Sequence, residues 1–492
     1  MAQQKVGAHP RGVAGVAAED PDRIALIEGA RRISFGELDA QANGLAVALA
    51  EDGVGHGDAV GMMLHNRAEW FAISHAVARL GAMFVPVSHR LTPSEVRYIV
   101  QDSGMKVCFA EAGVDLGVDG VRTVDVDRAG WFRPAPAPPS REFLHTPPTL
   151  MGYTSGTTGR PKAVERPAPV PAPEAATSAV AAFWGYGRET VQLMCGPLYH
   201  TAPSAYSEYA LWEGGRVVVQ EGFVGDRALS LIEEHRVTST QMVPAHFVRL
   251  LDAEWSRYDR SSIRLVIHAA APCPLSVKWR ILGVFPPGTV WELYGATESM
   301  GSVISPGEWM LKPGSVGRPF PGLHIRVLDE AGDPLPPGEI GTIYVSTFPG
   351  SKFSYRGDPD KTATAYREGY VTVGDLGHLD EHGYLYIADR RTDLIIRGGV
   401  NIYPAEVESA LAEDPDVGDA AVIGLPDERM GHRVHAIVEL RPGAEPDAGE
   451  ILGRLSERLA DYKRPTSIEF VEALPREPNG KVLKHRLQEE RR

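Results

Sequence analysis

A stretch rich in glycines and hydroxyl side chains is the part of the sequence best suited to bind a polyanion. It runs from Tyr153 to Lys162 and reads Tyr-Thr-Ser-Gly-Thr-Thr-Gly-Arg-Pro-Lys. Glycines allow tight turns that bring backbone N–H groups close to a ligand. It is not a Walker loop, because Gly159 is followed by Arg160 and Pro161 instead of Lys and Ser or Thr. The residues of the predicted polyphosphate cradle are Thr154, Ser155, Gly156, Thr157, Thr158, Gly159 and Lys162.

Two later segments place a carboxylate beside glycine, a combination suited to a nucleotide and its metal ion. Tyr294–Glu298 ends in a carboxylate, and Mg²⁺ prefers hard oxygen ligands, commonly one carboxylate together with phosphate oxygens and water. Tyr370–Asp375 ends in Gly-Asp, and the two oxygens of a carboxylate suit the vicinal hydroxyls of a ribose. Each segment taken alone is also compatible with an ordinary turn after a strand.

The order of these segments resembles the adenylate-forming superfamily, which includes acyl- and aryl-CoA synthetases, luciferases and the adenylation domains of peptide synthetases. The resemblance covers essentially the whole chain and implies ATP, Mg²⁺ and CoA as cofactor and co-substrates. It implies that the cradle grips the β- and γ-phosphates, that Thr154 and Glu298 flank the metal ion, and that Thr297 meets the α-phosphate. The family's Thr-His-x-Asn segment after the phosphate loop is missing, and a proline-rich run stands in its place.

The resemblance also assigns the nucleoside and the acid. Small residues before Pro272 stand where the family has Gly-Ala-Ala, and they would let adenine lie flat against the ring of Tyr294. Asp375 is implied to bind the ribose, and His200 stands where the family has a gate beside the acyl group. Beyond the cradle, the predicted ATP-binding residues are Ala269, Ala270, Ala271, Tyr294, Gly295, Ala296, Thr297, Asp375, Arg390 and Lys481. The predicted acyl pocket contains His200, Tyr206, Met242, Val243 and Gly295, which suits a hydrophobic, uncharged acid.

The C-terminal residues carry the remaining motifs. By the resemblance, Thr392 is the hinge within residues 391–393, and Gly398 and Gly399 line the pantetheine tunnel of CoA. Lys481 follows Asn-Gly, a pair typical of tight turns, and is implied to reach between the carboxylate and the α-phosphate. The residues implied to act in catalysis are therefore Lys481, Thr297, Glu298 and His200.

Helix and strand signals alternate over most of the chain. Ser34-Phe35-Gly36-Glu37 and Thr92-Pro93-Ser94-Glu95 are capping-box patterns that each start a helix. They alternate with short apolar strands, which predicts an α/β fold: mainly parallel sheets in a large N-terminal domain, with a small β subdomain at about residues 317–345. We expect residues 1–390 to form the adenylation core, 391–393 a hinge, and 394–492 a small, mobile α+β domain.

Composition excludes several classes of protein. The chain has 492 residues and a net charge of −14, so nucleic acid is an unfavourable partner. Its three cysteines are far apart, which argues against disulfides and zinc sites and fits a cytoplasmic location. No secretory signal is visible, and no apolar run approaches the roughly 20 residues that span a bilayer. A homodimer stays open.

The sequence therefore predicts an enzyme, an AMP-forming acyl-CoA ligase that activates a hydrophobic carboxylic acid through an acyl-adenylate. An acyl-AMP ligase, or an adenylation enzyme that loads a carrier-protein thiol, is the alternative. A non-catalytic nucleotide-binding protein is a third reading, and it is disfavoured because Glu298, Asp375, Arg390 and Lys481 occur together.

Overall fold

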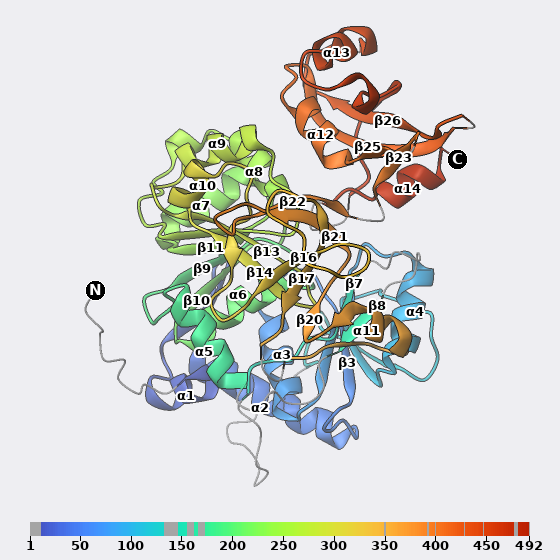
Figure 1. Cartoon of the computed structure of the whole chain (residues 1–492). Coiled ribbons are helices and arrows are strands. Elements are labelled where there is room, and N and C mark those ends of the chain that lie inside the picture. Colours follow the sequence, from blue (N-terminus) through green and yellow to red (C-terminus); the bar gives the residue numbers. More distant parts are fainter. Residues whose placement is uncertain are drawn as a thin grey trace. The chain divides into compact units, whose positions relative to one another are not determined.

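The computed structural model describes residues 11–131, 146–154, 162–165, 173–348, 351–390, 393–398, 400–427, 429–445, 447–476 and 481–491. The chain divides into two compact units. Figure 1 shows the helices and strands coloured along the sequence. Unit 1 comprises Met1–Met242, Ala253–Val266 and Pro349–Thr362. Unit 2 comprises Val243–Asp252, Ile267–Phe348 and Ala363–Arg492.

Unit 1 contains a parallel sheet whose strands alternate with helices. Its strands are β3 (Ala59–Met63), β4 (Met83–Pro86), β5 (Val107–Ala110) and β6 (Arg122–Asp125), in the order β4-β3-β5-β6. The connecting helices are α3 (Glu69–Arg79) and α4 (Pro93–Ser103). Helix α4 starts as the sequence predicts, because Thr92 and Glu95 form a complete capping box. It ends at Gly104, whose φ of 65° suits glycine.

A second sheet of unit 1 has the strand order β11-β9-β10-β1-β2. These strands are β1 (Ile24–Glu28), β2 (Arg31–Ser34), β9 (Val191–Met194), β10 (Arg216–Val219) and β11 (Ser239–Met242). All of these pairs are parallel except the hairpin β1–β2. Strand β9 is buried along its whole length, as expected for a parallel strand covered on both faces. The helices of this part are α1 (Gly12–Glu19), α2 (Phe35–Glu51), α5 (Pro173–Phe183), α6 (Thr201–Trp212) and α7 (Gly225–His235).

A small antiparallel sheet completes unit 1. Strands β7 (Gly152–Thr154) and β8 (Lys162–Glu165) form a hairpin, and β18 (Ser354–Tyr355) pairs with β8. The single-turn helix η1 (Trp255–Arg257) precedes β12 (Leu265–His268), and α11 (Pro359–Ala365) follows β18.

Unit 2 contains two antiparallel arrangements before its C-terminal part. The first joins β13 (Val290–Gly295), β14 (Met300–Ile304) and β15 (Arg318–Pro319), accompanied by α8 (Pro244–Leu251), α9 (Leu275–Val284) and α10 (Pro306–Leu311). The second has the order β19-β20-β17-β21-β22, with β16 paired to β17. Its strands are β16 (Ile325–Leu328), β17 (Gly341–Ser346), β19 (Tyr366–Arg367), β20 (Tyr370–Val371), β21 (Asp375–Leu379) and β22 (Leu385–Arg390).

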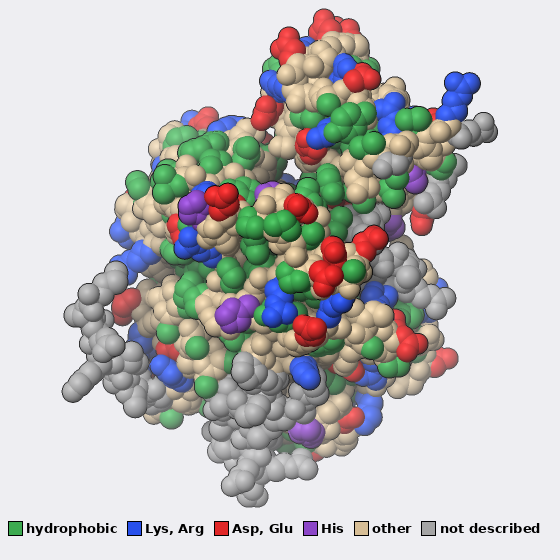
Figure 2. Space-filling model, viewed as in Figure 1, with side chains coloured by type: hydrophobic (Ala, Val, Ile, Leu, Met, Phe, Trp, Pro, Cys, Tyr) green, Lys and Arg blue, Asp and Glu red, His purple; other side chains and the backbone are tan. Residues whose placement is uncertain are grey.

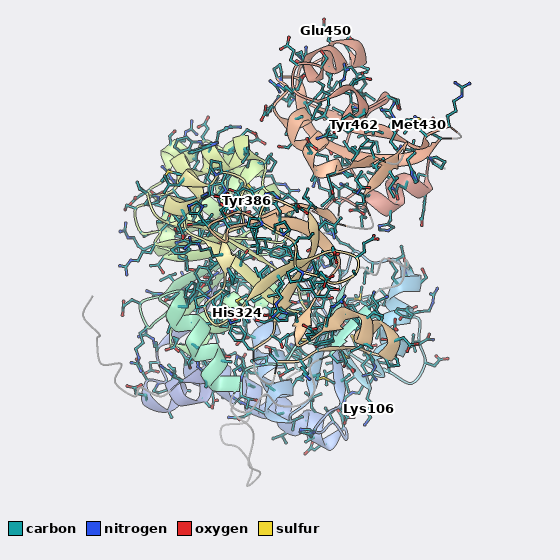
Figure 3. The ribbon with its side chains drawn as sticks, in the orientation of Figure 1. Lys106, His324, Tyr386, Met430, Glu450 and Tyr462 are labelled. Atoms are coloured by element: carbon teal, nitrogen blue, oxygen red, sulfur yellow. The ribbon has the colours of Figure 1, made fainter. Side chains whose placement is uncertain are left out.

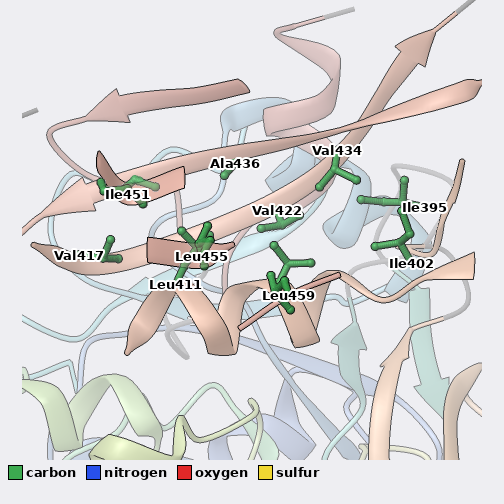
Figure 4. Close-up of a cluster of buried hydrophobic side chains, with 12 residues drawn as sticks. Ile395, Ile402, Leu411, Val417, Val422, Val434, Ala436, Ile451, Leu455 and Leu459 are labelled. Atoms are coloured by element: carbon green, nitrogen blue, oxygen red, sulfur yellow. The ribbon is translucent and has the colours of Figure 1, made fainter. Parts of the chain in front are cut away.

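The C-terminal part of unit 2 is a sheet covered by helices on both faces. Its strands are β23 (Ile395–Arg397), β24 (Val400–Ile402), β25 (Val417–Asp427), β26 (Gly431–Leu440) and β27 (Ser467–Val471). Its helices are α12 (Pro404–Ala412), α13 (Ala448–Leu455), η2 (Asp461–Lys463) and α14 (Lys484–Glu489). Alternate residues of β26 face opposite cores: Val434 and Ala436 pack with α12 and α13 (Figure 4), and Ile437 packs with Leu487 of α14.

Charged side chains are distributed over the surface. Figure 2 shows acidic and basic groups intermixed on the visible face, so the net charge of −14 is not gathered there into one patch. Within the described ranges, no helix is long and apolar enough to cross a membrane.

The predicted α/β class is confirmed, and most predicted elements are present within one to four residues of their expected ends. The sequence missed β6, which lies in the stretch expected to be a plain surface connection, and α14. It also missed α5, which begins at the last proline of the run after β8. The β subdomain reaches further than expected, because β19 to β22 belong to its sheet. The division into residues 1–390, 391–393 and 394–492 stays a prediction.

Candidate active site

The predicted phosphate cradle is the connection of a β-hairpin. Thr154, the last residue of β7, pairs in register with Lys162, the first residue of β8. The two ends of the cradle are therefore held opposite each other by the backbone. Ser155, Gly156, Thr157, Thr158 and Gly159 lie outside the described residues, as does the side chain of Thr154. Lys162 is mostly buried, and its Nζ lies 3.8 Å from a carboxylate oxygen of Asp358.

This hairpin is anchored by a network that the sequence did not predict. The hydroxyl of Tyr153 donates to Asp102 Oδ2 at 2.7 Å. Arg356 donates through Nε to the carbonyl oxygen of Asp102 at 2.8 Å and through Nη1 to Glu165, the last residue of β8. Burial, reinforced by the Asp102 carboxylate, raises the pKa of Tyr153 well above its ordinary value, so the phenol stays a donor. Both strands of the hairpin are thus tied to the end of α4.

The predicted metal carboxylate lies at the tip of a second hairpin. Strands β13 and β14 are antiparallel, and the amide of Ala296 donates to the carbonyl of Ser299 at 2.8 Å, which closes the turn. Thr297 and Glu298 occupy this turn, and the side chain of Glu298 is buried. Among the described residues, no group of three or more His, Cys, Asp or Glu side chains is arranged to hold a metal ion alone.

Two of the predicted nucleoside residues are in direct contact. Tyr294 OH donates to Asp375 Oδ2 at 2.8 Å, although the residues are 81 positions apart. Asp375 pairs in register with Arg390 across β21 and β22, so the backbones of the two predicted ribose residues lie side by side. The structure does not describe the side chain of Arg390. Gly301 permits this arrangement, because a Cβ there would lie 2.7 Å from Cδ1 of the Tyr294 ring. A lone glycine gave no signal of this role in the sequence.

The predicted adenine segment has a strained backbone. Ala269, Ala270 and Ala271 follow β12, and Ala270 has a φ of 77°. A left-handed conformation at a residue with a Cβ costs roughly 1–2 kcal/mol. Such strain persists only where surrounding structure determines the conformation. The segment is therefore held in a definite shape rather than left to relax.

Gly398, one of the two predicted tunnel glycines, lies in a tight turn with apolar neighbours. Its φ is 58°, its amide donates to the carbonyl of Met430 at 2.7 Å, and a Cβ there would lie 2.6 Å from the methyl carbon of Met430. Met430 and Tyr462 are labelled in Figure 3 and are 43% and 45% exposed. Ile396 and Val400, on either side of the turn, are similarly exposed. Gly399 and Thr392 lie outside the described residues.

Lys481 stands directly after a chain reversal. A bridge between Arg476 and Val482, and a 2.8 Å hydrogen bond from the amide of Leu483 to the carbonyl of Pro475, close this reversal. The Asn-Gly pair expected to form the turn lies outside the described residues. Lys481 itself is half-buried, and its presentation by an Asn-Gly turn stays a prediction.

The predicted acyl residues are divided between the two units. In unit 1, His200 precedes α6, and its ring centroid lies 4.7 Å from that of Tyr199. Tyr206 is buried against other aromatic rings, and Met242 is buried at the end of β11. Val243, which is buried, and Gly295 belong to unit 2.

Burial disfavours the thiolate form of two cysteines. Burial raises the pKa of Cys195 and of Cys108 to about 12, which keeps both as thiols near neutral pH.

The order of these motifs along the chain is that of AMP-binding, adenylate-forming enzymes. The comparison with protein families agrees. The family described as "AMP-binding enzyme" matches residues 13–348. The family described as "AMP-binding enzyme C-terminal domain" matches residues 406–481. The chain belongs to this family, and the predicted membership is confirmed.

Similar proteins include several ligases. The 2-succinylbenzoate–CoA ligase of Geobacillus kaustophilus is 35% identical, over 95% of this chain and 95% of its own. The fatty acid–[acyl-carrier-protein] ligase ScoC of Streptomyces coeruleorubidus is 30% identical, over 96% of this chain and 94% of its own. Among solved structures, the o-succinylbenzoate CoA synthetase of Bacillus subtilis in complex with its acyl-adenylate intermediate has a TM-score of 0.86 and 31% identity, covering 97% of this chain and 98% of that one.

Proposed function

We propose that the protein is an ATP- and Mg²⁺-dependent acyl-CoA ligase that forms AMP. Membership in the AMP-binding family supports the class. The observation that carries the proposal is the contact between Tyr294 and Asp375, which joins the adenine and ribose motifs in unit 2. That unit also contains the Thr297–Glu298 turn and Lys481.

The chemistry requires two half-reactions. A carboxylate does not acylate a thiol directly, because its leaving group would be oxide. In the first half-reaction a carboxylate oxygen bonds to the α-phosphorus of ATP, and the bond from that phosphorus to the bridging oxygen breaks to release pyrophosphate. In the second, the sulfur of CoA bonds to the acyl carbon, AMP leaves with the former carboxylate oxygen, and the thiol proton passes to solvent.

The phosphates are assigned to unit 1. The hairpin loop from Thr154 to Lys162 would hold the β- and γ-phosphates through backbone amides, hydroxyls and one ammonium group. The in-register pairing of Thr154 with Lys162 supports this role, because it keeps the mouth of the loop narrow.

The metal ion and the α-phosphate are assigned to the Thr297–Glu298 turn. Glu298 and Thr154 would hold Mg²⁺, and the buried carboxylate of Glu298 fits a cation that needs one anionic oxygen from the protein. Bound there, Mg²⁺ would neutralise charge on the phosphates. Thr297 would contact the α-phosphate, and Lys481 would stabilise the charge that develops on it.

The nucleoside is assigned to unit 2. Adenine would lie between Ala269–Ala271 and Tyr294, with Gly295 and Ala296 beside it. Asp375 would accept hydrogen bonds from the two ribose hydroxyls, and the phenol of Tyr294 holds its carboxylate in place at 2.8 Å. Arg390 would contact the ribose or the α-phosphate, which agrees with its backbone pairing to Asp375.

The second half-reaction is assigned to the C-terminal residues. Rotation about residues 391–393 would withdraw Lys481 and bring in the Gly398–Gly399 turn for the thiol arm. Exposed Ile396, Val400, Met430 and Tyr462 around that turn support a face that is covered in another state, because grouped apolar side chains mark contact surfaces.

CoA is the preferred acceptor, because relatives spanning nearly the whole chain are named as CoA ligases. A carrier-protein thiol is the second candidate, and the similarity to a fatty acid–[acyl-carrier-protein] ligase favours it. For the acid, buried Tyr206, Met242 and Val243 support a hydrophobic, uncharged molecule gated by His200.

A panel of carboxylic acids tests this function. Pyrophosphate release is measured for linear, aryl and polycyclic acids, alone, with CoA and with a phosphopantetheinylated carrier protein. We expect acid-dependent release and thioester formation on CoA. Thioester on the carrier alone would select the second candidate, and release with no acid would refute the proposal.

Lys481→Ala separates the half-reactions. We expect acyl-AMP formation to fall by about 10²–10³, the scale seen when one electrostatic donor is removed. Transfer from preformed acyl-AMP to CoA should persist. Arg486→Ala, which removes the same charge from exposed α14, is the matched control and should leave both steps intact. Equal loss of both steps in Lys481→Ala would contradict its role.

A further inference from the structure

A buried cluster of three ionisable side chains adjoins, along the chain, the segments proposed to bind the nucleoside. Lys278 on α9 contacts His268 Nε2, at the end of β12, and lies 3.2 Å from Glu292 Oε2 on β13. The distance from His268 Nε2 to that same carboxylate oxygen is 3.4 Å. Lys278 and His268 are fully buried and Glu292 is 7% exposed.

Aromatic rings enclose this cluster. The Nζ of Lys278 lies 5.5 Å from the centroid of the Trp309 ring, and the ring of His268 meets Phe247 edge-on at 5.1 Å. Burial raises the pKa of Glu292, and the neighbouring ammonium opposes this rise. Burial and the same ammonium lower the pKa of His268 well below its ordinary value. The cluster is a buried hydrogen-bonded pair of Lys278 and Glu292 beside an imidazole whose lowered pKa favours its neutral form.

The protonation of the imidazole follows from its contacts. Because Lys278 Nζ can only donate, His268 Nε2 accepts, and the ring proton is on Nδ1. Within the described residues, Nδ1 is buried and has no hydrogen-bond partner. A buried ion pair is often no more stabilising than apolar side chains of the same volume, and an unpaired buried N–H is unfavourable. Fold stability alone is therefore a poor explanation for the cluster.

Its position in the chain offers a better one. His268 immediately precedes the strained Ala269–Ala271 segment, in which Ala270 has a φ of 77°. Glu292 is two residues before Tyr294 on the same strand, so the two side chains leave the same face of β13. The cluster thus links the two backbone segments that are proposed to enclose adenine.

We propose that Lys278, held by Glu292 and His268, is a positioning residue that fixes the spacing of the adenine segment and Tyr294. The inference rests on the proposed function, because it takes these segments to be the adenine site. Lys278 does not touch the reacting atoms in this account. Its loss should weaken the binding of ATP much more than it slows the chemical step or weakens the binding of pyrophosphate.

The test uses Lys278→Met in ATP–pyrophosphate exchange, which measures the KM of ATP and that of pyrophosphate in one assay. We expect the KM of ATP to rise about tenfold, corresponding to about 1.4 kcal/mol, with kcat and the KM of pyrophosphate within about twofold of wild type. Pyrophosphate contains no adenine, so a general loss of folded structure would not produce this split.

The matched control is Arg79→Met. Arg79 is also a buried cation paired with a carboxylate, that of Asp39, but it lies on α3 in unit 1. It should lower the melting temperature without changing the KM of ATP. An equal rise in that KM for both variants would overturn the inference.

A double variant, Lys278→Met with Glu292→Gln, removes both charges and avoids an unpaired buried carboxylate. We expect it to regain part of the melting temperature while the KM of ATP stays high. If the KM returns to the wild-type value together with stability, the cluster is structural only. If Lys278→Met does not fold, the double variant carries the same prediction. Failure of the proposed function is recognised separately, because wild type would then show no acid-dependent exchange.

Discussion

The hairpin proposed to hold phosphate and the segments proposed to hold adenine are anchored in opposite ways. The hairpin β7–β8 is tied to the end of α4 by Arg356 and Tyr153, and the Arg356 side chain is 35% exposed. The adenine segments are tied by Lys278 and Glu292, which are almost completely buried. Water screens the first network and is excluded from the second. The comparison teaches that two segments proposed for one function can be anchored within their own units by very different networks, one partly exposed and one buried.

Removing the buried carboxylate should have the largest effect. Glu292→Ala leaves the ammonium of Lys278 without its anion, and breaking one side of a buried pair costs about 3–5 kcal/mol. We expect a lower urea midpoint at an unchanged slope, measured by circular dichroism. A loss below about 1 kcal/mol would mean that water reaches the cluster, and the contrast between the two networks would fail.

Removing the exposed cation should cost much less. Arg356→Met loses its contacts with Glu165 and Asp102, and partly exposed pairs contribute up to about 1 kcal/mol. Because Arg356 anchors the hairpin, the KM of pyrophosphate should rise. The dissociation constant of AMP should stay unchanged. Isothermal titration with AMP provides the second measurement. An equal fold-change in AMP affinity and in the KM of pyrophosphate would contradict the separate anchoring of the hairpin and of the adenine segments.

The sequence predicted the local parts of both regions and none of the long-range links. The capping boxes at Ser34 and Thr92 formed as expected, because cap and partner are three residues apart and their chemistry is local. The contact between Arg356 and Asp102 joins residues 254 positions apart, and no spacing rule relates them. The composition of α9 likewise gave no reason to separate Lys278 from a surface lysine.

The helix missed after the phosphate loop has a physical explanation. Residues 166–172 of the proline-rich run lie outside the described residues, and α5 begins at Pro173, its last proline. Proline is tolerated in the first turn, where its missing N–H is not needed, so the last proline of a run can begin a helix. The family motifs predicted the residues of the site, and those assignments stay predictions. The pairing of Thr154 with Lys162 depends on strand register, which required the structure.

Acid should affect unit 1 through a partly buried histidine. Burial, with His65 and Arg90 nearby, lowers the pKa of His89 to about 4, against about 6.5 in an unfolded chain. Between pH 4 and pH 6.5 the unfolded state then binds more protons than the folded state. The contribution of His89 to the free energy of unfolding is therefore complete above pH 6.5 and is lost as the pH falls toward 4. Urea midpoints at pH 7.5, 5.5 and 4.5 should fall less steeply for His89→Gln than for wild type. Parallel curves would show that His89 does not titrate this way.

The smallest expected effect concerns backbone strain. Ala270→Gly removes a Cβ from a residue with a φ of 77°, which relieves roughly 1–2 kcal/mol of backbone strain. Glycine loses more conformational entropy on folding than alanine, which costs about 0.5–1 kcal/mol. The net change should be a stabilisation of roughly 0.5 kcal/mol, visible as a small rise in melting temperature. Ala271→Gly is the control, because its φ is not positive and it should destabilise by about 0.5–1 kcal/mol. Equal losses in both variants would show that Ala270 is not strained.

The most direct test of the proposed function follows the carboxylate oxygen. The preferred acid is labelled with ¹⁸O in both carboxylate positions and incubated with ATP, Mg²⁺, CoA and the protein, and the products are weighed by mass spectrometry. An acyl-adenylate requires one labelled oxygen in AMP, one in the thioester and none in pyrophosphate. AMP without the label, or pyrophosphate with the label, would contradict the account.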